Sequence, residues 1–130
     1  MAIPTSIRQR GFAKWYEREL LTGHAHLVLL VLAALGAIGS LEAFSQLGSQ
    51  RLLMVASLLA SAAIGVWALR RYLFHLMRAE LIANQASCPA CGVYARWQVE
   101  AADAGDEAAG RPPAMQVCCR RCRHVWRIEW

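Results

Sequence analysis

The sequence predicts an α-helical membrane hairpin followed by a small all-β domain. Three observations predict this fold class: a basic amphipathic segment, then two long apolar segments with a short polar connection, then two Cys-x-x-Cys pairs. Hydrophobic residues make up 57% of the 130 residues and the mean hydropathy is +0.30, which is too apolar for most soluble domains of this length. We expect an amphipathic interfacial helix over residues 1–23, a two-span hairpin with a helical extension over residues 24–86, and the β domain over residues 87–130.

The N-terminal segment is basic and has helical periodicity. Its cations lie largely away from its apolar positions, which are Ile7, Phe12, Trp15, Tyr16, Leu20 and Leu21. This pattern favours a helix lying in the membrane interface, where Trp and Tyr are enriched. The alternative is a helix that packs its apolar face into a groove on protein.

Two apolar segments have the length of membrane spans. The first runs from His26 to Phe44 with Glu42 as its only formally charged residue, and about nineteen residues at about 1.5 Å each give about 28 Å of helix. The second, residues 52–69, carries no charge and gives about 27 Å by the same arithmetic. A signal peptide is the alternative for the first segment, but a second segment of similar length follows it closely, as in an antiparallel hairpin.

The charged flanks predict the orientation of this hairpin. The connection offers only Arg51, whereas seven cations flank the other ends of the spans: Arg8, Arg10, Lys14, Arg18, Arg70, Arg71 and Arg78. The positive-inside rule therefore predicts a multi-pass protein of the bacterial inner membrane with both termini in the cytoplasm. A reducing compartment also suits the cysteine thiols described below.

Small residues recur along both spans at intervals that allow helices to pack closely: Ala33, Ala37, Gly36, Ser40, Ser57, Ser61 and Gly65. They either hold the two helices of one chain together or form a surface for another membrane subunit. Helical periodicity continues through residues 70–86, so we expect the second helix to extend beyond the span.

Four of the five cysteines form two pairs, Cys88 with Cys91 and Cys119 with Cys122. A Cys-x-x-Cys turn brings two sulfurs to one tetrahedral ion, so the two pairs together predict a four-sulfur metal site. Cys118 adjoins Cys119, and neighbours on a strand point to opposite faces, so the two-residue spacing favours Cys119 as the ligand. The alternative for the quartet is a pair of redox disulfides.

Strand-like sequence separates and follows the two pairs. We expect strands at Val93–Glu100, Met115–Cys118 and His124–Trp130, with a loop over residues 101–113. With Pro89 and Gly92 in the first pair and the tail Cys122-Arg-His-Val-Trp, this order resembles the four-cysteine zinc-ribbon family over residues 87–130. The resemblance implies Zn(2+) held by the four cysteines; Arg123 departs from it because glycine is usual there.

A closed four-sulfur site leaves no coordination position for a substrate, so we expect a structural metal and no enzymatic activity. The favoured function is an adaptor or accessory subunit whose partners are the lipid bilayer and either a membrane protein or a second copy of the chain. No small-molecule substrate is inferred. A rubredoxin-like carrier holding iron in the same sulfurs is an alternative.

Other charged and aromatic residues suggest less favoured sites. Nucleic-acid binding is suggested by Arg120, Arg121 and Arg123 together with Arg96, Trp97, Arg127 and Trp130. Those arginines also offset the formal charge of −2 on zinc with four thiolates. His24, His26 and His75 are candidates for haem or metal ligation, and Glu42 for a pair with Arg51.

Overall fold

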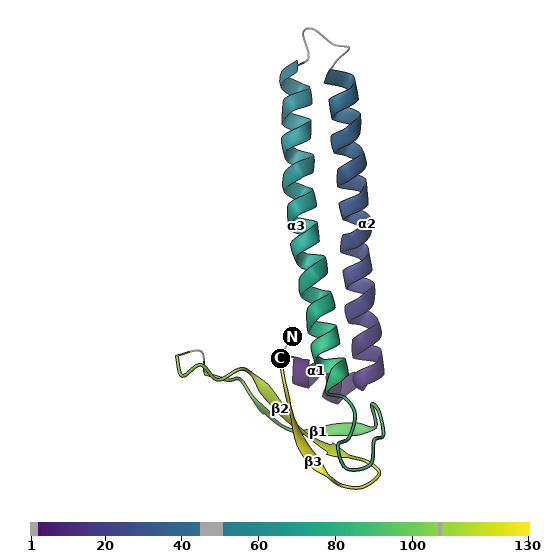
Figure 1. Cartoon of the computed structure of the whole chain (residues 1–130), viewed down its shortest axis with the longest axis vertical. Coiled ribbons are helices and arrows are strands. Elements are labelled where there is room, and N and C mark those ends of the chain that lie inside the picture. Colours follow the sequence, from purple (N-terminus) through teal and green to yellow (C-terminus); the bar gives the residue numbers. More distant parts are fainter. Residues whose placement is uncertain (1–2, 45–50, 107) are drawn as a thin grey trace. The chain divides into compact units, whose positions relative to one another are not determined.

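The computed structural model describes residues 3–44, 51–106 and 108–130. Its elements in chain order are α1 (Ile3–Arg10), α2 (Phe12–Phe44), α3 (Arg51–Asn84), β1 (Trp97–Asp103), β2 (Ala114–Cys119) and β3 (Val125–Glu129) (Figure 1). The chain divides into two compact units. We call Leu21–His75 the helical unit, and Met1–Leu20 with Leu76–Trp130 the sheet unit.

The helical unit contains two antiparallel helical segments that approach closely through small residues. The Ser40 and Ser57 hydroxyl oxygens lie 2.9 Å apart. A Cβ placed on Gly36 would lie 3.0 Å from the Ser61 hydroxyl oxygen, and one placed on Gly65 would lie 3.6 Å from the Ala33 Cβ. Because these pairs run in opposite directions along α2 and α3, the helices are antiparallel. Of the two roles expected for the small residues, the structure shows contact within one chain.

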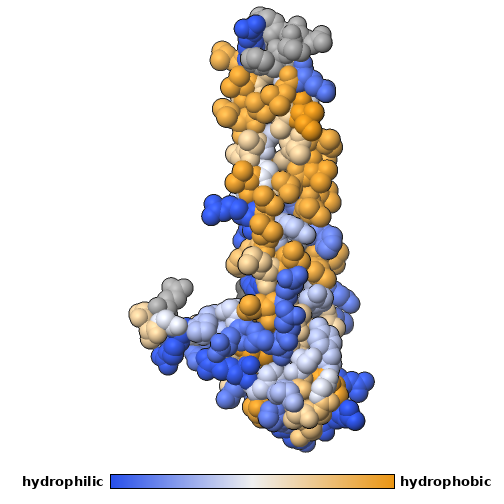
Figure 2. Space-filling model, in the orientation of Figure 1, coloured by the Kyte–Doolittle hydropathy of each residue, from blue (hydrophilic) through white to orange (hydrophobic). Residues whose placement is uncertain are grey.

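The outer surface of this unit is apolar. Both α2 and α3 are long and apolar enough to cross a membrane, with mean hydropathies of 1.9 and 2.2, and only 11% of each most apolar window is buried. Leu32, Leu59 and Val66 are more than half exposed. Figure 2 shows hydrophobic side chains over most of the face in view along these helices.

The sheet unit is built on a three-stranded antiparallel sheet of order β1-β2-β3. Trp97 is opposite Cys119 and Val117 is opposite Trp126, with a bulge between Val99 and Ala101. Side chains alternate across a strand, so one face of the sheet is apolar. That face forms the core with residues of α1, α2 and α3 and with Ala86, which follows α3. The sheet contributes Trp97, Val99, Met115, Val117 and Ile128, and the helices contribute Ile3, Ile7, Phe12, Trp15 and Ile82.

The N-terminal segment is two helices, not the single helix expected over residues 1–23. Gly11 has φ of +83° and its N–H donates to the Ile7 carbonyl at 2.8 Å, which ends α1 before α2 begins. Ile7 and Trp15 are 4% and 6% exposed, within the core of the sheet unit. The amphipathic pattern suited either a helix in the membrane interface or a helix packed on protein. The structure shows packing on protein, because the sheet covers the apolar face.

An ion pair joins the ends of α2 and α3 that lie in the sheet unit. Arg78 Nη2 donates to Glu19 Oε1 at 2.7 Å, and the two side chains are 28% and 11% exposed. Arg78, counted above among the flanking cations, therefore has an acidic partner within the protein.

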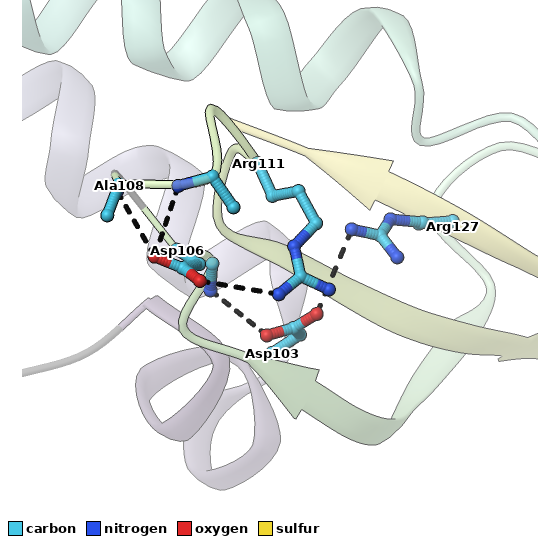
Figure 3. A network of polar contacts seen from close by, with 7 residues as sticks. Asp103, Asp106, Ala108, Arg111 and Arg127 are labelled. Carbon is cyan, nitrogen blue, oxygen red and sulfur yellow. Dashed lines mark hydrogen bonds and ion pairs between the residues drawn. The ribbon is translucent and has the colours of Figure 1, made fainter.

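The described part of the connection between β1 and β2 contains a network of local hydrogen bonds. A Cβ on Gly105 would lie 2.6 Å from the Arg111 carbonyl oxygen, so only glycine fits there. Asp106 accepts hydrogen bonds from the Ala108 N–H and from Arg111, and Asp103 lies 3.9 Å from Arg127 (Figure 3). These local bonds extend the β1–β2 hairpin as a narrow arm.

Candidate metal centre

Two turns of matching geometry present the paired cysteines. In the first, the Cys88 N–H donates to the Val93 carbonyl at 3.0 Å, and the Gly92 N–H donates to the Cys88 carbonyl at 2.8 Å. In the second, the Cys119 N–H donates to the His124 carbonyl at 2.9 Å, and the Arg123 N–H donates to the Cys119 carbonyl at 3.1 Å. The same two bonds therefore close each turn, with Arg123 in the place that Gly92 holds in the first.

The backbone at these two equivalent positions is left-handed. Gly92 has φ of +67° and Arg123 has φ of +62°. Glycine adopts this conformation without strain, whereas a side chain with a Cβ is crowded there. The position at which Arg123 departs from the zinc-ribbon pattern is thus left-handed in the structure, and the Arg side chain is strained there.

The turns bring four sulfurs together. All Sγ atoms of Cys88, Cys91, Cys119 and Cys122 lie within 4.8 Å of one another. The shortest distances join the two turns: Cys88 Sγ to Cys122 Sγ is 3.5 Å, and Cys91 Sγ to Cys119 Sγ is 3.7 Å. A tetrahedral ion with metal–sulfur bonds of about 2.3 Å places its sulfurs about 3.8 Å apart. The group can therefore hold a metal ion with little movement.

Backbone N–H groups distribute negative charge unequally over these sulfurs. Hydrogen bonds from the N–H groups of Cys122 and Arg121 to the Cys119 sulfur lower the pKa of Cys119 to about 6, and the Arg121 bond is 3.4 Å long. The His124 N–H acts to lower the pKa of Cys122, but desolvation and the three neighbouring thiols outweigh it and raise that pKa to about 12. Cys119 is thus the first thiolate, and a divalent cation would compensate the charge of the others.

Cys118 lies apart from this group. Its buried thiol faces the carbonyl oxygens of Cys119 and Arg123 at 3.8 and 3.7 Å. Burial, and then the carboxylate of Glu100, raise the pKa of Cys118. The structure therefore brings Cys119 to the other three sulfurs and leaves Cys118 as a protonated packing residue.

The four-sulfur group is partly open to solvent. Cys88 and Cys119 are buried, Cys91 is half-buried and Cys122 is exposed. Arg120, Arg121 and Arg123, between and beside the ligands of the second turn, are all exposed. These three cations adjoin Cys119 and Cys122 in the sequence.

Trp97, expected as a stacking residue of a nucleic-acid surface, is in the core instead. It is 5% exposed, its indole N–H donates to the Ala86 carbonyl at 3.0 Å, and its ring lies 5.3 Å from that of Phe12. Trp130, the other aromatic residue of that predicted surface, is half-buried and packs against the same core. Trp97 is therefore not available for stacking on bases, and Trp130 is only partly exposed.

The structure also brings together two histidines that the sequence did not pair. The ring centroids of His26 and His75 are 5.6 Å apart, and His26 Nδ1 lies 2.7 Å from the Thr22 carbonyl oxygen. Within residues 3–44, 51–106 and 108–130, however, the one group of three or more metal-ligating side chains is the cysteine group. The helical periodicity of the two segments could have predicted that His26 and His75 lie on facing sides of an antiparallel helix pair. The pair of Glu42 with Arg51 stays a prediction.

Comparison of the chain with protein-family models, with curated proteins and with solved structures finds no match in any of the three. The assignment of function therefore depends on the geometry above.

Proposed function

We propose that the chain is a membrane-anchored adaptor, in which a two-span helical hairpin fixes a zinc-holding β domain at the cytoplasmic face of a bacterial inner membrane. The observation that carries the proposal is the four-sulfur group, whose shortest distances of 3.5 and 3.7 Å suit one tetrahedral ion. Four protein ligands complete such an ion, so it supports a fold and a docking surface better than it supports catalysis.

The exposed apolar surface supports the membrane part of the proposal. A core helix of a soluble protein can match a span in length and composition, but its residues would be mostly buried. Only 11% of each apolar window is buried here. Lipid satisfies such a surface, and a helix leaves no backbone group unpaired inside it.

Orientation is proposed from the cations that flank the helices, with both termini cytoplasmic. Topology reporters fused within residues 45–50, which lie outside the described residues, and after Trp130 would test it. We expect the reporter fused within residues 45–50 to be found in the periplasm and the reporter fused after Trp130 to be found in the cytoplasm. A periplasmic C-terminus would contradict both the orientation and the reduced state of the thiols.

Zinc is the metal we propose, because four thiolates suit it and the resemblance to zinc ribbons implies it. Metal analysis of freshly purified protein should give one zinc per chain and no visible absorption band. Iron with a visible thiolate charge-transfer band would instead support the electron-carrier function.

The adaptor role requires a membrane-protein partner that recognises the folded β domain. A partner co-purified from gently solubilised membranes should be lost with Cys88→Ser and retained with Cys118→Ser. Equal recovery with both variants would place the partner's contact elsewhere and contradict docking through the metal-bound domain.

A further inference from the structure

The sheet unit has two adjoining hollows where the α1–α2 junction faces the free edge of β1. They have volumes of about 510 and 520 Å³ and share Arg10, Gly11, Trp97 and Arg120 as lining residues. We call them together the cationic groove. Each volume falls within the range of small-ligand pockets in proteins.

The charge of the groove has a single sign. Five cations line it and no acidic residue does: Arg8, Arg10, Lys14, Arg96 and Arg120. Arg8 is held in place, since its Nη2 donates to the Glu100 carbonyl oxygen at 2.8 Å at the edge of β1. Ion pairs in the described part of the sheet unit include those of Arg78, Arg111 and Arg127, none of which lines the groove. Among the described residues, no acidic side chain forms an ion pair with any of the five cations.

Packing of α1 explains why these cations face outward. Ile3 and Ile7 turn into the core. Arg8 lies about 100° around the helix from Ile7, Arg10 is the last residue of the helix, and both are exposed. Gly11 then ends α1, and Lys14 enters the groove from the first turn of α2. The fold therefore gathers cations from α1, α2 and the segments beside β1 and β2 around the two adjoining hollows.

We propose that the cationic groove binds the phosphate head group of an anionic phospholipid. Guanidinium groups bind phosphate oxygens in pairs, and basic segments next to a membrane span are attracted to anionic lipid. In the chain, three of the five cations, Arg8, Arg10 and Lys14, lie N-terminal to the apolar stretch that begins at His26. Nucleic acid is the less favoured ligand, because Trp97 in the groove wall is buried in the core and offers no face for stacking. The inference rests on the proposed membrane insertion.

Native mass spectrometry of the full chain in mild detergent tests the proposal by titration with phosphatidylglycerol and with phosphatidylcholine of the same acyl chains. We expect phosphatidylglycerol to bind preferentially. Arg10→Gln and Arg120→Gln should each weaken it about fivefold, and the double variant about 25-fold. Arg127→Gln is the matched control, since it removes the same charge from a residue paired with Asp103 and Glu129, and should change binding less than twofold.

Equal binding of the two lipids, or an equal loss in the Arg127→Gln control, would overturn the proposal. Complete displacement of phosphatidylglycerol by millimolar inorganic phosphate would assign the groove to a free anion, and displacement by a single-stranded oligonucleotide would assign it to nucleic acid. Unchanged metal content in the variants shows that the sheet unit is folded. Release of the wild-type protein from membranes by alkaline carbonate would instead show that membrane insertion, not the groove, was wrong.

Discussion

The helical unit and the sheet unit place their side chains in opposite ways. In the helical unit the contact between helices is made by small residues such as Gly36 and Ser61, while Leu32 and Leu59 are exposed. In the sheet unit the large apolar residues Met115 and Ile128 are 1% and 0% exposed. This difference is the one expected if the first unit lies in lipid, as proposed, and the second in water.

The two units also differ in what stabilises them. The helices pair all their interior backbone groups locally, whereas the sheet is small and its two cysteine turns are joined by no covalent bond. Metal binding to four free thiols supplies on the order of 10–16 kcal/mol in small zinc domains. Stability of the sheet unit should therefore depend on metal far more than that of the helical unit.

Metal removal should give the largest difference between the units. A chelator added to the full chain in detergent should abolish amide hydrogen-exchange protection in β1, β2 and β3, while amides of Val28–Gly39 keep theirs. Cys88→Ser should show the unprotected sheet before any chelator is added. If the strands stayed protected without metal, the sheet core alone would be sufficient for folding.

Truncation of a large apolar residue should strongly lower the stability of the sheet unit but not that of the helical unit. Ile82 is 0% exposed in the core of the sheet unit, so Ile82→Ala should lower the free energy of unfolding of that unit by about 2–5 kcal/mol. Leu59 is 65% exposed, and Leu59→Ala should leave the thermal stability of the helical unit in detergent nearly unchanged. A large loss for Leu59→Ala would reveal a protein contact on that face.

Enlarging a small residue should affect the helical unit selectively. Gly36→Leu must displace Ser61, whereas Gly39→Leu enters open space, since no atom lies within 4 Å of its Cβ position. We expect Gly36→Leu to lower the melting temperature in detergent by several degrees and Gly39→Leu to leave it unchanged. Equal effects of the two variants would show that close packing at Gly36 does not hold the helices together.

The smallest expected effect is a gain in the stability of the sheet unit. Arg123→Gly should relieve the left-handed strain at φ of +62° and raise the free energy of unfolding of the metal-bound sheet unit by about 1 kcal/mol. Denaturant unfolding monitored by Trp fluorescence measures this change. Gly92→Ala, at the equivalent position of the first turn, should produce a loss of similar size.

Periodicity and cysteine spacing predicted much of this architecture, but not what each apolar face contacts. The pattern of Ile7 and Trp15 was the same whether lipid or protein covered it, and the break at Gly11 depends on one backbone angle. The strand expected from Val93 begins instead at Trp97, because Val93 closes the first cysteine turn and Ala95 has φ of +58°. The cationic groove joins residues such as Arg10 and Arg120 that only tertiary packing brings together.

The central claim is that Cys88, Cys91, Cys119 and Cys122 hold one metal ion. Its most direct test is zinc stoichiometry in purified single variants of the five cysteines. We predict loss of stoichiometric zinc for Cys88→Ser, Cys91→Ser, Cys119→Ser and Cys122→Ser, and one zinc per chain for Cys118→Ser. Retention of zinc by Cys119→Ser with its loss in Cys118→Ser would contradict the site described here.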